Sequence, residues 1–414
     1  MHQTVNCVYS AAKETEIRSE TVLDASYDMI SRPDAQTQVK VGISILAIDE
    51  LDLKSQKLST AGWLTFEWDD SRLTWDPAAK DDIDVIFSKP GNIWKPELLI
   101  DNSLENLAII ADSDLYLRVE STGTVEWEPP TLFVTHCQVD ITYYPYDRQK
   151  CSINIASWGY TVEEVALTTL NTPVNLVDFQ THGEWEIYKS EVAITNLTET
   201  TDAGVVRKFP QIAFWIYLSR RTDFYNLNVV MPIILTSLLV ALTFIVPVDC
   251  GEKLSYILTV FLAIAVLLTL VADSLPPTSI TTSVLGLYLG FVTVFAAVGI
   301  LIGVLILILY HKEGEPSTGS PLVKVSRICA MCACSSHLVR STGSKVKPAP
   351  ETTDDVKSMS TQQVEEYPEY YDMTWKTMSV ILDRFCFIVF SIVTVIMNLS
   401  FIIALVVGGK AQSL

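Results

Sequence analysis

Seven residues between Gly251 and Ser274 recur at spacings of three and four, which bring side chains to one face of an α-helix. They are Glu252, Ser255, Thr259, Leu262, Val266, Thr269 and Asp273. The stripe is acidic at both ends, carries hydroxyl groups and is apolar in its middle. Several copies around an axis would form carboxylate rings, which favour cations, and an apolar ring that can close a pore by dewetting. The alternative is an amphipathic packing helix with polar caps. A single helix in lipid gains nothing from such a stripe, so we favour a pore lining.

Four apolar stretches follow residue 225, and each is long enough to cross a bilayer core of about 30 Å. They run over Asn228–Val246, Leu254–Ala272, Ser283–Tyr310 and Phe385–Val407. The third exceeds the usual ~20 residues, and we expect it to tilt or to protrude from the bilayer. Short connections make the first three helices neighbours, and the stripe lies on the second.

Charge in the connecting segments predicts the orientation. The polar segment His311–Asp372 contains seven Lys or Arg residues, whereas Ser274–Ile280 contains none. The positive-inside bias therefore places His311–Asp372 in the cytosol and residues 1–225 outside, as in a multi-pass protein of the plasma membrane. A secretory leader should precede such an ectodomain. Because Met1–Ser10 has no apolar core, we expect that the leader was removed or replaced.

The chain has 414 residues and a formal net charge of −19, with a mean hydropathy of +0.30. The acid is concentrated in residues 1–225, which contain 18 Lys or Arg and 35 Asp or Glu, against 11 and 13 in the remainder. Such a balance argues against a nucleic-acid partner, because little would neutralise phosphates. A polar domain is therefore joined to a membrane domain.

Alternation of apolar and polar residues predicts β-strands in the first domain. It is clearest in Lys40–Ile48, Trp63–Trp68, Trp185–Ile194 and Gln211–Leu218. About 225 residues of short strands suit one β-sandwich, with a weak helical signal at Ser19–Ile30. We therefore predict a β-sandwich extracellular domain followed by a four-helix transmembrane bundle.

The predicted organisation has five parts. They are an extracellular ligand-binding domain (1–225), transmembrane helices 1–3 (226–310, with the pore helix at 252–273), a largely disordered cytoplasmic loop (311–372), a juxtamembrane helix with the fourth span (373–407) and an extracellular tail (408–414). Pro368 would break the juxtamembrane helix, which we expect to begin near Glu369.

Three of the eight cysteines, Cys7, Cys137 and Cys151, lie in the oxidising ectodomain, so one pair and one leftover thiol are expected. Cys137 and Cys151 flank thirteen residues, and a bridge closing that loop would stabilise the fold by about 3 kcal/mol. Three alternatives stay open for Cys329-Ala-Met-Cys332-Ala-Cys334 with nearby His337. They are reduced thiols, palmitoylation next to a membrane span, and a zinc site of irregular spacing.

Six motifs spread over nearly the whole chain resemble those of the Cys-loop receptors, which are pentameric ligand-gated ion channels of the nicotinic acetylcholine receptor type. They are Tyr144-Pro145-Tyr146-Asp147 in the thirteen-residue loop, Trp94-Lys95-Pro96-Glu97, Trp127-Glu128-Pro129-Pro130, Pro232 in the first span, Gly251-Glu252-Lys253, and Pro276-Pro277-Thr278-Ser279. The resemblance implies a ring-shaped pentamer with ligand sites between adjacent ectodomains. It also implies that the Cys loop presses on the loop after the pore helix.

The resemblance assigns roles along the pore. Glu252 falls at the family's selectivity position, where anion-passing relatives carry a different, proline-containing sequence, so it implies cation conduction. Leu262 matches the central hydrophobic gate, Val266 is its neighbour on the stripe, and Asp273 matches the outer acidic ring.

Coupling between the domains is implied in the same way. Arg220 should pair with Glu50 or with Asp49, unless it merely marks the membrane boundary. The other matching contact residues are Tyr144, Pro145, Tyr146 and Pro277.

The ligand site departs from the family's pattern. Family members hold an amine inside an aromatic cage through cation–π contacts. The matching positions are Trp158, Tyr160, Phe209 and, from the complementary face, Trp63. Asp101 replaces an expected tyrosine, no aromatic residue lies between Tyr188 and Phe209, and the vicinal cysteine pair of acetylcholine-binding subunits is absent.

Two explanations compete for this altered site. The subunit lacks a principal acetylcholine site, or Asp101 forms an ion pair with an amine. The alternative roles are a solvated acid for Asp101 and buried sandwich residues for Trp63 and Trp158. The sequon Asn196-Leu197-Thr198 lies in the altered segment and predicts a glycan at Asn196.

The leading interpretation is a cation channel gated by a small extracellular ligand, with an amine as one candidate. The expected partners are four further subunits, permeant cations and the lipid membrane. An accessory subunit of a heteropentamer that binds no agonist is the alternative, and an adhesion or sensing ectodomain would leave the stripe unexplained. We expect no enzyme activity, metal or cofactor, since the five histidines are scattered without a catalytic constellation.

Overall fold

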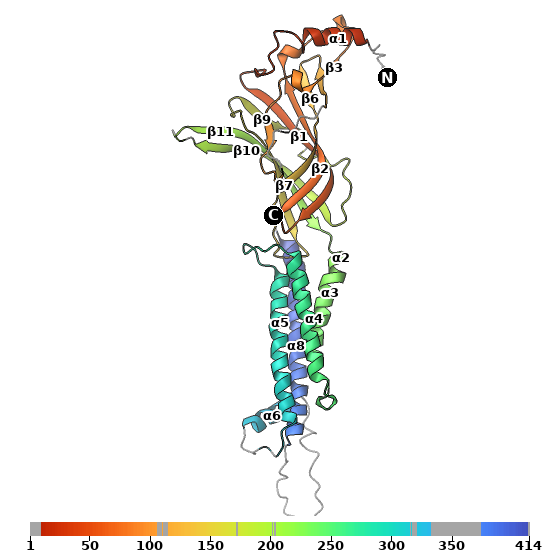
Figure 1. Cartoon of the computed structure of the whole chain (residues 1–414), viewed down its shortest axis with the longest axis vertical. Helices are drawn as coiled ribbons and strands as arrows, with labels where there is room; N and C mark the ends of the chain where they lie inside the picture. Colours follow the sequence, from red (N-terminus) through yellow and green to blue (C-terminus); the bar gives the residue numbers. More distant parts are fainter. Residues whose placement is uncertain are drawn as a thin grey trace, which may run out of the picture. The chain divides into compact units, whose positions relative to one another are not determined.

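The structure is a computed structural model of the chain. It describes residues 10–105, 110, 115–170, 173–200, 202, 204–314, 316, 321–332 and 374–412. The chain divides into two compact units (Figure 1). The ectodomain unit comprises Met1–Asp223, Asp273–Ser283 and Leu405–Leu414, and the helical unit comprises Phe224–Ala272 and Val284–Ala404.

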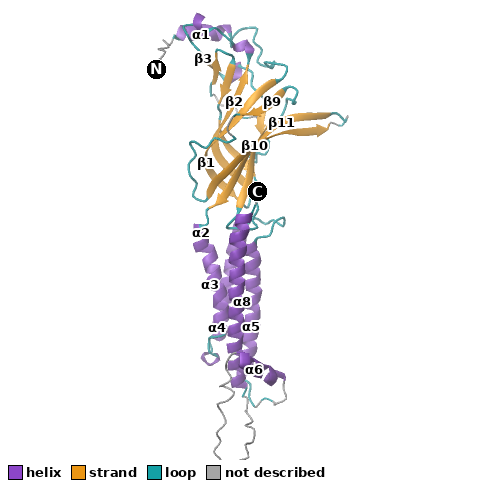
Figure 2. Ribbon diagram, turned by 180° about the vertical axis from the view of Figure 1, so that it is seen from behind, coloured by secondary structure: helices purple, strands orange, loops and turns teal. Residues whose placement is uncertain are grey.

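The ectodomain unit contains two β-sheets (Figure 2). A seven-stranded sheet has the order β3-β5-β6-β2-β1-β9, with β7 paired to β2, and a four-stranded sheet has the order β10-β11-β8-β4. The strands are β1 (Thr37–Asp52), β2 (Lys57–Asp69), β3 (Val85–Ser88), β4 (Leu98–Ile100), β5 (Leu117–Glu120), β6 (Thr124–Trp127), β7 (Pro130–His136), β8 (Arg148–Ser157), β9 (Val165–Thr169), β10 (Trp185–Thr200) and β11 (Val206–Arg220). Short 3₁₀ turns lie at Ser71–Leu73, Pro77–Ala79 and Pro90–Asn92.

The core of the ectodomain unit is formed by alternate residues of these strands. In β1, Val39 and Val41 are fully buried while Lys40 between them is exposed, as a pleated strand with one covered face requires. Both sheets contribute large apolar side chains that are buried to within 1%, namely Phe66 and Trp68 from β2, Ile153 and Ile155 from β8 and Phe214 from β11. Removing this apolar surface from water is the main stabilising term. The predicted β-sandwich is confirmed.

The N-terminal helix of the ectodomain unit differs from the weak prediction at Ser19–Ile30. Helix α1 runs over Ala11–Glu20 and begins at Ser10, whose Oγ accepts a hydrogen bond from the backbone N–H of Lys13 at 3.5 Å. The prediction placed the helix too late in the chain, because an N-cap serine before a helix-forming run outweighs the apolar residues that follow.

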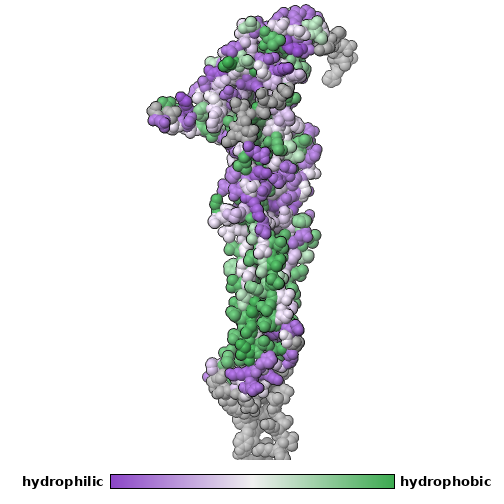
Figure 3. All heavy atoms as spheres, in the orientation of Figure 1, coloured by the Kyte–Doolittle hydropathy of each residue, from purple (hydrophilic) through white to green (hydrophobic). Residues whose placement is uncertain are grey.

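The helical unit contains the apolar helices, and apolar side chains gather over them (Figure 3). Among the described residues, four helical runs are long and apolar enough to cross a membrane: Asp223–Leu242, Lys253–Ser274, Val284–Tyr310 and Trp375–Ala411. The first consists of α2 (Asp223–Tyr225), a π-helical turn (Asn226–Val230) and α3 (Met231–Leu242). The others are α4, α5 and α8, and a 3₁₀ turn at Val248–Cys250 precedes α4. Pro232 lies at the second residue of α3, directly after the π-helical turn, so its missing N–H falls where the regular α-helical hydrogen-bond pattern is already interrupted.

A buried polar cluster joins three of these helices. The Asn398 side chain, on α8, donates to Ser237 Oγ of α3 at 2.9 Å and accepts from the Tyr288 hydroxyl of α5 at 2.7 Å. Asn398 is 8% exposed, and an unsatisfied amide in hydrocarbon is costly, so these bonds fix how the helices face one another.

The segment predicted to be a largely disordered cytoplasmic loop contains a helix that the sequence analysis did not predict. Helix α6 spans Pro321–Cys332. Val323 packs against Trp375 and Met378 of α8, and Cys329 is buried beside Ile381. An amphipathic segment with a partner face to bury against orders even in a polar loop. Cys7, Cys334, His337 and the predicted helix start near Glu369 lie outside the described residues.

Candidate functional site

The stripe on α4 is exposed along its whole length in the single subunit. All seven residues are exposed, with Leu262 at 63% and Val266 at 50%. The buried residues on α4 are instead Lys253, Ile257, Val260, Ile264 and Val271. The helix therefore packs with its apolar back and presents a face of carboxylates, hydroxyls and hydrocarbon.

The two threonine hydroxyl groups of this face are held by their own helix. Thr259 Oγ1 donates to the carbonyl of Ser255 at 2.8 Å, and Thr269 Oγ1 donates to the carbonyl of Val266 at 2.8 Å. Each hydroxyl proton is thus used within the helix, and the hydroxyl oxygens keep lone pairs that can accept or contact a cation. Leu254, Leu258 and Leu270 flank the stripe and are also exposed.

The Cys loop is closed and internally braced. A disulfide joins Cys137 to Cys151, as predicted. The buried amide of Gln149 donates to Asp147 Oδ2 at 2.6 Å and to the carbonyl of Asp140 at 2.9 Å, and it accepts from the backbone N–H of Asp140 at 2.9 Å. Because both ends of the loop are tied to one side chain, the Tyr144–Asp147 segment between them has little freedom.

Arg220 does not take the predicted partner. Its guanidinium, 1% exposed, binds Asp147 in a bidentate pair at 2.7 and 3.1 Å and also pairs with Glu184. Its Cζ atom lies over two aromatic rings, 5.0 Å from the ring centre of Tyr144 and 4.1 Å from that of Trp185. The predicted pairing with Glu50 or Asp49 is therefore wrong.

Register explains the exchange of partners. The pairing of β11 with β8 sets Ser219 opposite Arg148, so the Arg220 N–H donates to the carbonyl of Asp147 at 3.3 Å. Glu50 meanwhile pairs with Lys57 at 3.0 Å, and Asp49 accepts from Ser59 at 3.2 Å. Asp147 belongs to the Tyr144-Pro145-Tyr146-Asp147 motif. This motif was the sequence feature that could have indicated the partner of Arg220.

The same unit brings the Cys loop onto the end of the pore helix. Tyr144 is 3% exposed and hydrogen bonds to the side chain of Ser274. Burial raises the pKa of Tyr144, and the cation of Arg220 opposes that rise. Pro145 is also buried and Tyr146 half-buried, whereas Pro277, predicted to make contact, is exposed and its neighbour Pro276 is buried.

The chain's C-terminal end also lies on the Cys loop, a contact that the sequence did not predict. Gln412 donates to Asp140 Oδ2 at 2.9 Å and accepts from the backbone N–H of Arg148 at 3.1 Å. A Cβ atom at Gly409 would approach the carbonyl oxygen of Tyr146 to 2.5 Å. The Gly408-Gly409 pair at the end of α8 was the local sequence feature that could have indicated this contact, since glycine lets another segment of backbone approach closely.

The predicted ligand residues lie on or beside the four-stranded sheet, except Trp63. Gln211 of β11 pairs with Ala156 of β8, so Phe209 and Trp158 lie at the same level, just beyond that pairing. Asp101 follows Ile100 of β4, which pairs with Ile155, and its N–H donates to the carbonyl of Asn154 at 3.1 Å, so Asp101 lies further along β8. Trp158 is 76% exposed, which removes the alternative that it is a buried sandwich residue. Trp63 is half-buried in β2 of the other sheet, beside Ser44 and Pro130.

Asp101 is held by its surroundings rather than solvated. Its Oδ2 accepts a hydrogen bond from the side-chain amide of Gln211, whose oxygen accepts from Thr195 at 2.7 Å. Its Oδ1 is buried, and hydrogen bonds from the Asn154 side chain and the Asn102 backbone N–H also reach the carboxylate. Burial raises the pKa of the Asp101 carboxyl, and the hydrogen bond from Gln211 opposes the rise.

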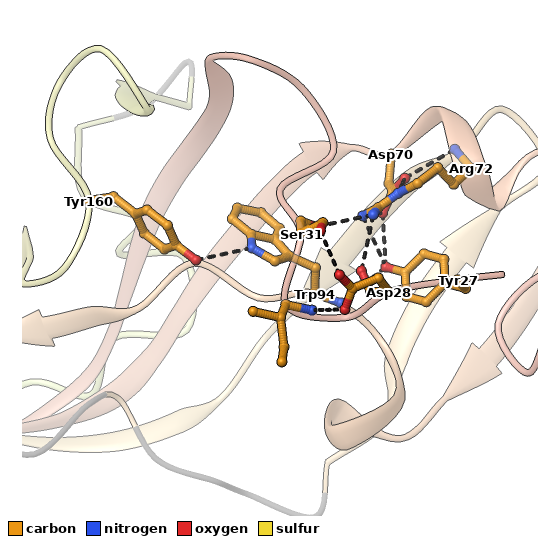
Figure 4. A network of polar contacts seen from close by, with 8 residues as sticks. Tyr27, Asp28, Ser31, Asp70, Arg72, Trp94 and Tyr160 are labelled. Atoms are coloured by element: carbon orange, nitrogen blue, oxygen red, sulfur yellow. Dashed lines mark hydrogen bonds and ion pairs between the residues drawn. The ribbon is translucent and has the colours of Figure 1, made fainter. Parts of the chain in front are cut away.

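A polar network fixes the backbone behind these residues (Figure 4). Buried Asp70 pairs with Arg72 at 2.7 Å and accepts from the Tyr27 hydroxyl at 2.9 Å, and that hydroxyl accepts from the Trp94 N–H at 3.1 Å. The Trp94 indole donates to the Tyr160 hydroxyl at 3.4 Å. Burial raises the pKa of Tyr27, which therefore remains a neutral hydroxyl. The network makes Trp94 and Tyr160 structural supports for the site.

The segment that carries Trp158 is tied to the same support. The Trp158 N–H donates to the carbonyl of Glu97 at 3.4 Å, and the Tyr160 N–H donates to Ser157 Oγ at 3.1 Å. The motif beginning at Trp94 therefore positions the exposed indole of Trp158 from behind.

Comparison with known proteins supports this reading of the geometry. The family model described as "Neurotransmitter-gated ion-channel ligand binding domain" matches residues 16–222, and that described as "Neurotransmitter-gated ion-channel transmembrane region" matches residues 229–366. A neuronal acetylcholine receptor subunit alpha-3 of Carassius auratus is 33% identical over 255 residues, which cover 60% of this chain and 48% of that protein. A neuronal acetylcholine receptor subunit alpha-2 of Homo sapiens is 32% identical over 284 residues, covering 66% and 52%.

The chain spans about half the length of the curated relatives it matches. Both family models describe parts of ligand-gated channels, with an extracellular ligand-binding domain and membrane-spanning helices in the plasma membrane. Such proteins are not enzymes, which agrees with the prediction. The chain belongs to the neurotransmitter-gated ion-channel family and is similar to neuronal nicotinic acetylcholine receptor subunits.

Proposed function

We propose that this chain is a subunit of a cation-selective channel opened by a small extracellular ligand, with the α4 stripe lining the pore of a pentamer. The observation that carries the proposal is the exposure of the entire stripe while the opposite face of α4 is buried. A membrane helix that exposes two carboxylates needs water or a partner on that side, and a central pore supplies water.

The order of groups along the stripe supports cation conduction. Five Glu252 carboxylates would form a ring of like charge at one end, and five Asp273 carboxylates a ring at the other. Between them, Leu262 and Val266 would form a ring from which water can withdraw. The same helix thus supplies a filter and a gate.

The test is expression in oocytes with measurement of reversal potentials in graded NaCl. We expect Glu252→Gln to reduce the preference for cations several-fold, because the ring loses its charge. The control is Glu313→Gln, which removes an exposed acid beyond α5 and off the stripe. A cation preference that survives Glu252→Gln intact would contradict the assignment of Glu252 as the filter.

For the ligand, we propose an amine that binds next to Asp101. The carboxylate of Asp101 is half-buried and held by Gln211, and a carboxylate in such a setting can pair with an ammonium group. The exposed ring of Trp158 and the partly exposed ring of Phe209 add cation–π faces, and Trp63 of the adjacent subunit would complete the cage.

An accessory subunit that binds no agonist is the second candidate. The observation that favours it is the exposed outer part of β10, Ile194–Thr200, which carries no aromatic residue for a cage. Expression of the chain alone separates the two candidates. Surface-labelled homomers that pass no current under any amine, together with current on co-expression, would favour the accessory role.

Two further assignments remain proposals. We propose a glycan on Asn196, which is exposed in β10 opposite Pro210, and a shift in electrophoretic mobility after glycosidase treatment would reveal it. We also propose that Tyr144, Asp147 and Arg220 transmit ligand binding to the end of α4, since they form one buried cluster that reaches Ser274.

A further inference from the structure

The cytoplasmic end of the stripe presents an electrostatic problem. Glu252 is followed directly by Lys253, so each subunit carries a cation beside the carboxylate of its proposed filter. Five lysines at this level would cancel five glutamates. Being off the stripe is not sufficient, because a flexible lysine side chain of several carbons can reach past a helix face.

In the structure the Lys253 ammonium is turned into the helical unit. Glu252 is exposed, but Lys253 is only 3% exposed. Its Nζ pairs with Oδ1 of Asp383, which lies on α8, 130 positions later in the chain and 7% exposed. Its Nζ also lies 5.8 Å from the ring centre of Phe244. Helices α4 and α8 run beside each other in both ribbon views (Figure 1 and Figure 2).

This pair has two consequences for charge. The Asp383 carboxylate cancels the Lys253 cation within the subunit, so the level of Glu252 keeps a net charge of about −1 per subunit. The pair also anchors the long side chain away from the exposed face. A buried ammonium without its carboxylate would be forced outward, because an isolated charge is poorly solvated inside the protein.

We propose that Asp383 is a positioning residue for ion selection, which holds the Lys253 ammonium out of the pore and neutralises it. The inference rests on the proposed function of Glu252 as a cation filter. It adds a residue of the fourth span, remote from the pore face, as a determinant of which ions pass.

The first variant to test is Asp383→Asn, expressed alone or with whichever subunits are required for current. Reversal potentials in graded NaCl and single-channel amplitudes are measured beside the wild type. We expect the cation-to-anion permeability ratio to fall roughly threefold to tenfold, and single-channel conductance to fall with it, because up to five cations are released near the filter. Asp383→Glu, which keeps the carboxylate, should retain wild-type selectivity.

The double variant Lys253→Gln with Asp383→Asn separates charge from packing. It removes both charges and keeps two side chains that can hydrogen bond. We expect its permeability ratio to return to the wild-type value, because no released cation remains. A double variant as unselective as Asp383→Asn would overturn the proposal, since Asp383 would then act independently of Lys253.

If the Asp383→Asn variant does not reach the cell surface when expressed alone, co-expression with wild-type subunits still tests the proposal. Tagged Asp383→Asn subunits are co-expressed with the wild type, and we expect discrete, smaller single-channel amplitudes. Wild-type amplitudes only, with tagged subunits verified in surface receptors, would overturn the proposal.

The inference about Asp383 and the proposed function can be refuted separately. A cation-selective wild type that loses selectivity in Glu252→Gln but not in Asp383→Asn would refute the inference alone. A wild-type channel that prefers anions would refute the proposed function and the inference with it.

Discussion

At the scale of residues, the proposed role of Asp101 would change the chemistry of the ligand site while leaving the frame around it in place. The frame, from Trp94 through Tyr160, is held by buried hydrogen bonds that do not involve Asp101. Within it, a carboxylate replaces a ring, and the structure couples that carboxylate to Gln211 of the neighbouring strand region. Under the proposed function, a cage that binds through ring electrostatics would become one that binds through a charge.

If Asp101 pairs with an amine as proposed, agonist binding should be sensitive to pH. Burial raises the pKa of Asp101, so it becomes protonated at a higher pH than an exposed aspartate, whereas a bound ammonium favours the ionised form. Agonist potency should therefore fall as the pH is lowered towards that raised pKa. Asp101→Asn should weaken potency about 10- to 100-fold and abolish this pH dependence. Dose–response curves between pH 5.5 and 8 provide the measurement, and an Asp101→Asn variant with unchanged pH dependence would exclude the ion pair.

Leu262 allows a second test at the scale of one residue. Leu262→Ser should lower the agonist concentration for half-maximal current by roughly tenfold, or open channels without agonist, because a hydroxyl ring wets more readily than a leucine ring. Leu258→Ser is the matched control, since Leu258 is also exposed on α4 but lies off the stripe. Equal effects of the two variants would argue against a gate at Leu262.

At the scale of elements, the contacts that matter join segments far apart in the chain. Residues of the Cys loop pair with Arg220 at the end of β11 and form hydrogen bonds with Ser274 at the end of α4 and with Gln412. Local patterns cannot indicate such partners, because a pattern describes which face of an element is apolar and not what lies against it. The Arg220–Glu50 prediction failed for this reason.

Gly409 tests whether the chain end matters to the Cys loop. A methyl group there would lie 2.5 Å from the carbonyl oxygen of Tyr146, which is backbone and cannot rotate away. Gly409→Ala should therefore displace the end of α8, cost about 1–3 kcal/mol in that contact and shift agonist dose–response curves to higher concentration. Gly290→Ala, at a position with nothing within 4 Å, is the control, and identical curves for both variants would count against a role for the contact.

For the whole molecule, the asymmetry of charge is the dominant property. Residues 1–225 hold 35 acidic against 18 basic side chains, and five such domains around an axis would enrich cations near the pore entrance. Screening limits the reach of this field to about 8–10 Å at physiological salt and extends it to about 30 Å at 0.01 M.

Conductance at low salt tests this idea. We expect single-channel conductance to fall less steeply than permeant-ion concentration between 150 and 10 mM, because the acidic domains maintain local cations when screening is weak. Adding an impermeant salt at 10 mM permeant ion should lower conductance. A conductance strictly proportional to bulk concentration would show that the acid does not face the ion path.

The sequence by itself determined what depends on neighbours along the chain. The stripe on α4, the four apolar helices, the strand alternation and the short disulfide loop all follow from helical or strand period and from a spacing of fourteen positions. Backbone geometry fixes these relations before any tertiary contact forms. The exposed face of α4 carries the residues that the helical period predicts.

Only the tertiary structure decided which charges cancel. Lys253 is adjacent to Glu252 in sequence, yet it pairs with Asp383 on α8, and Arg220 pairs with Asp147 rather than Glu50. These choices depend on strand register and on the way helices face one another. In a buried setting an unpaired charge is so unfavourable that the available partner, rather than the sequence neighbour, is selected.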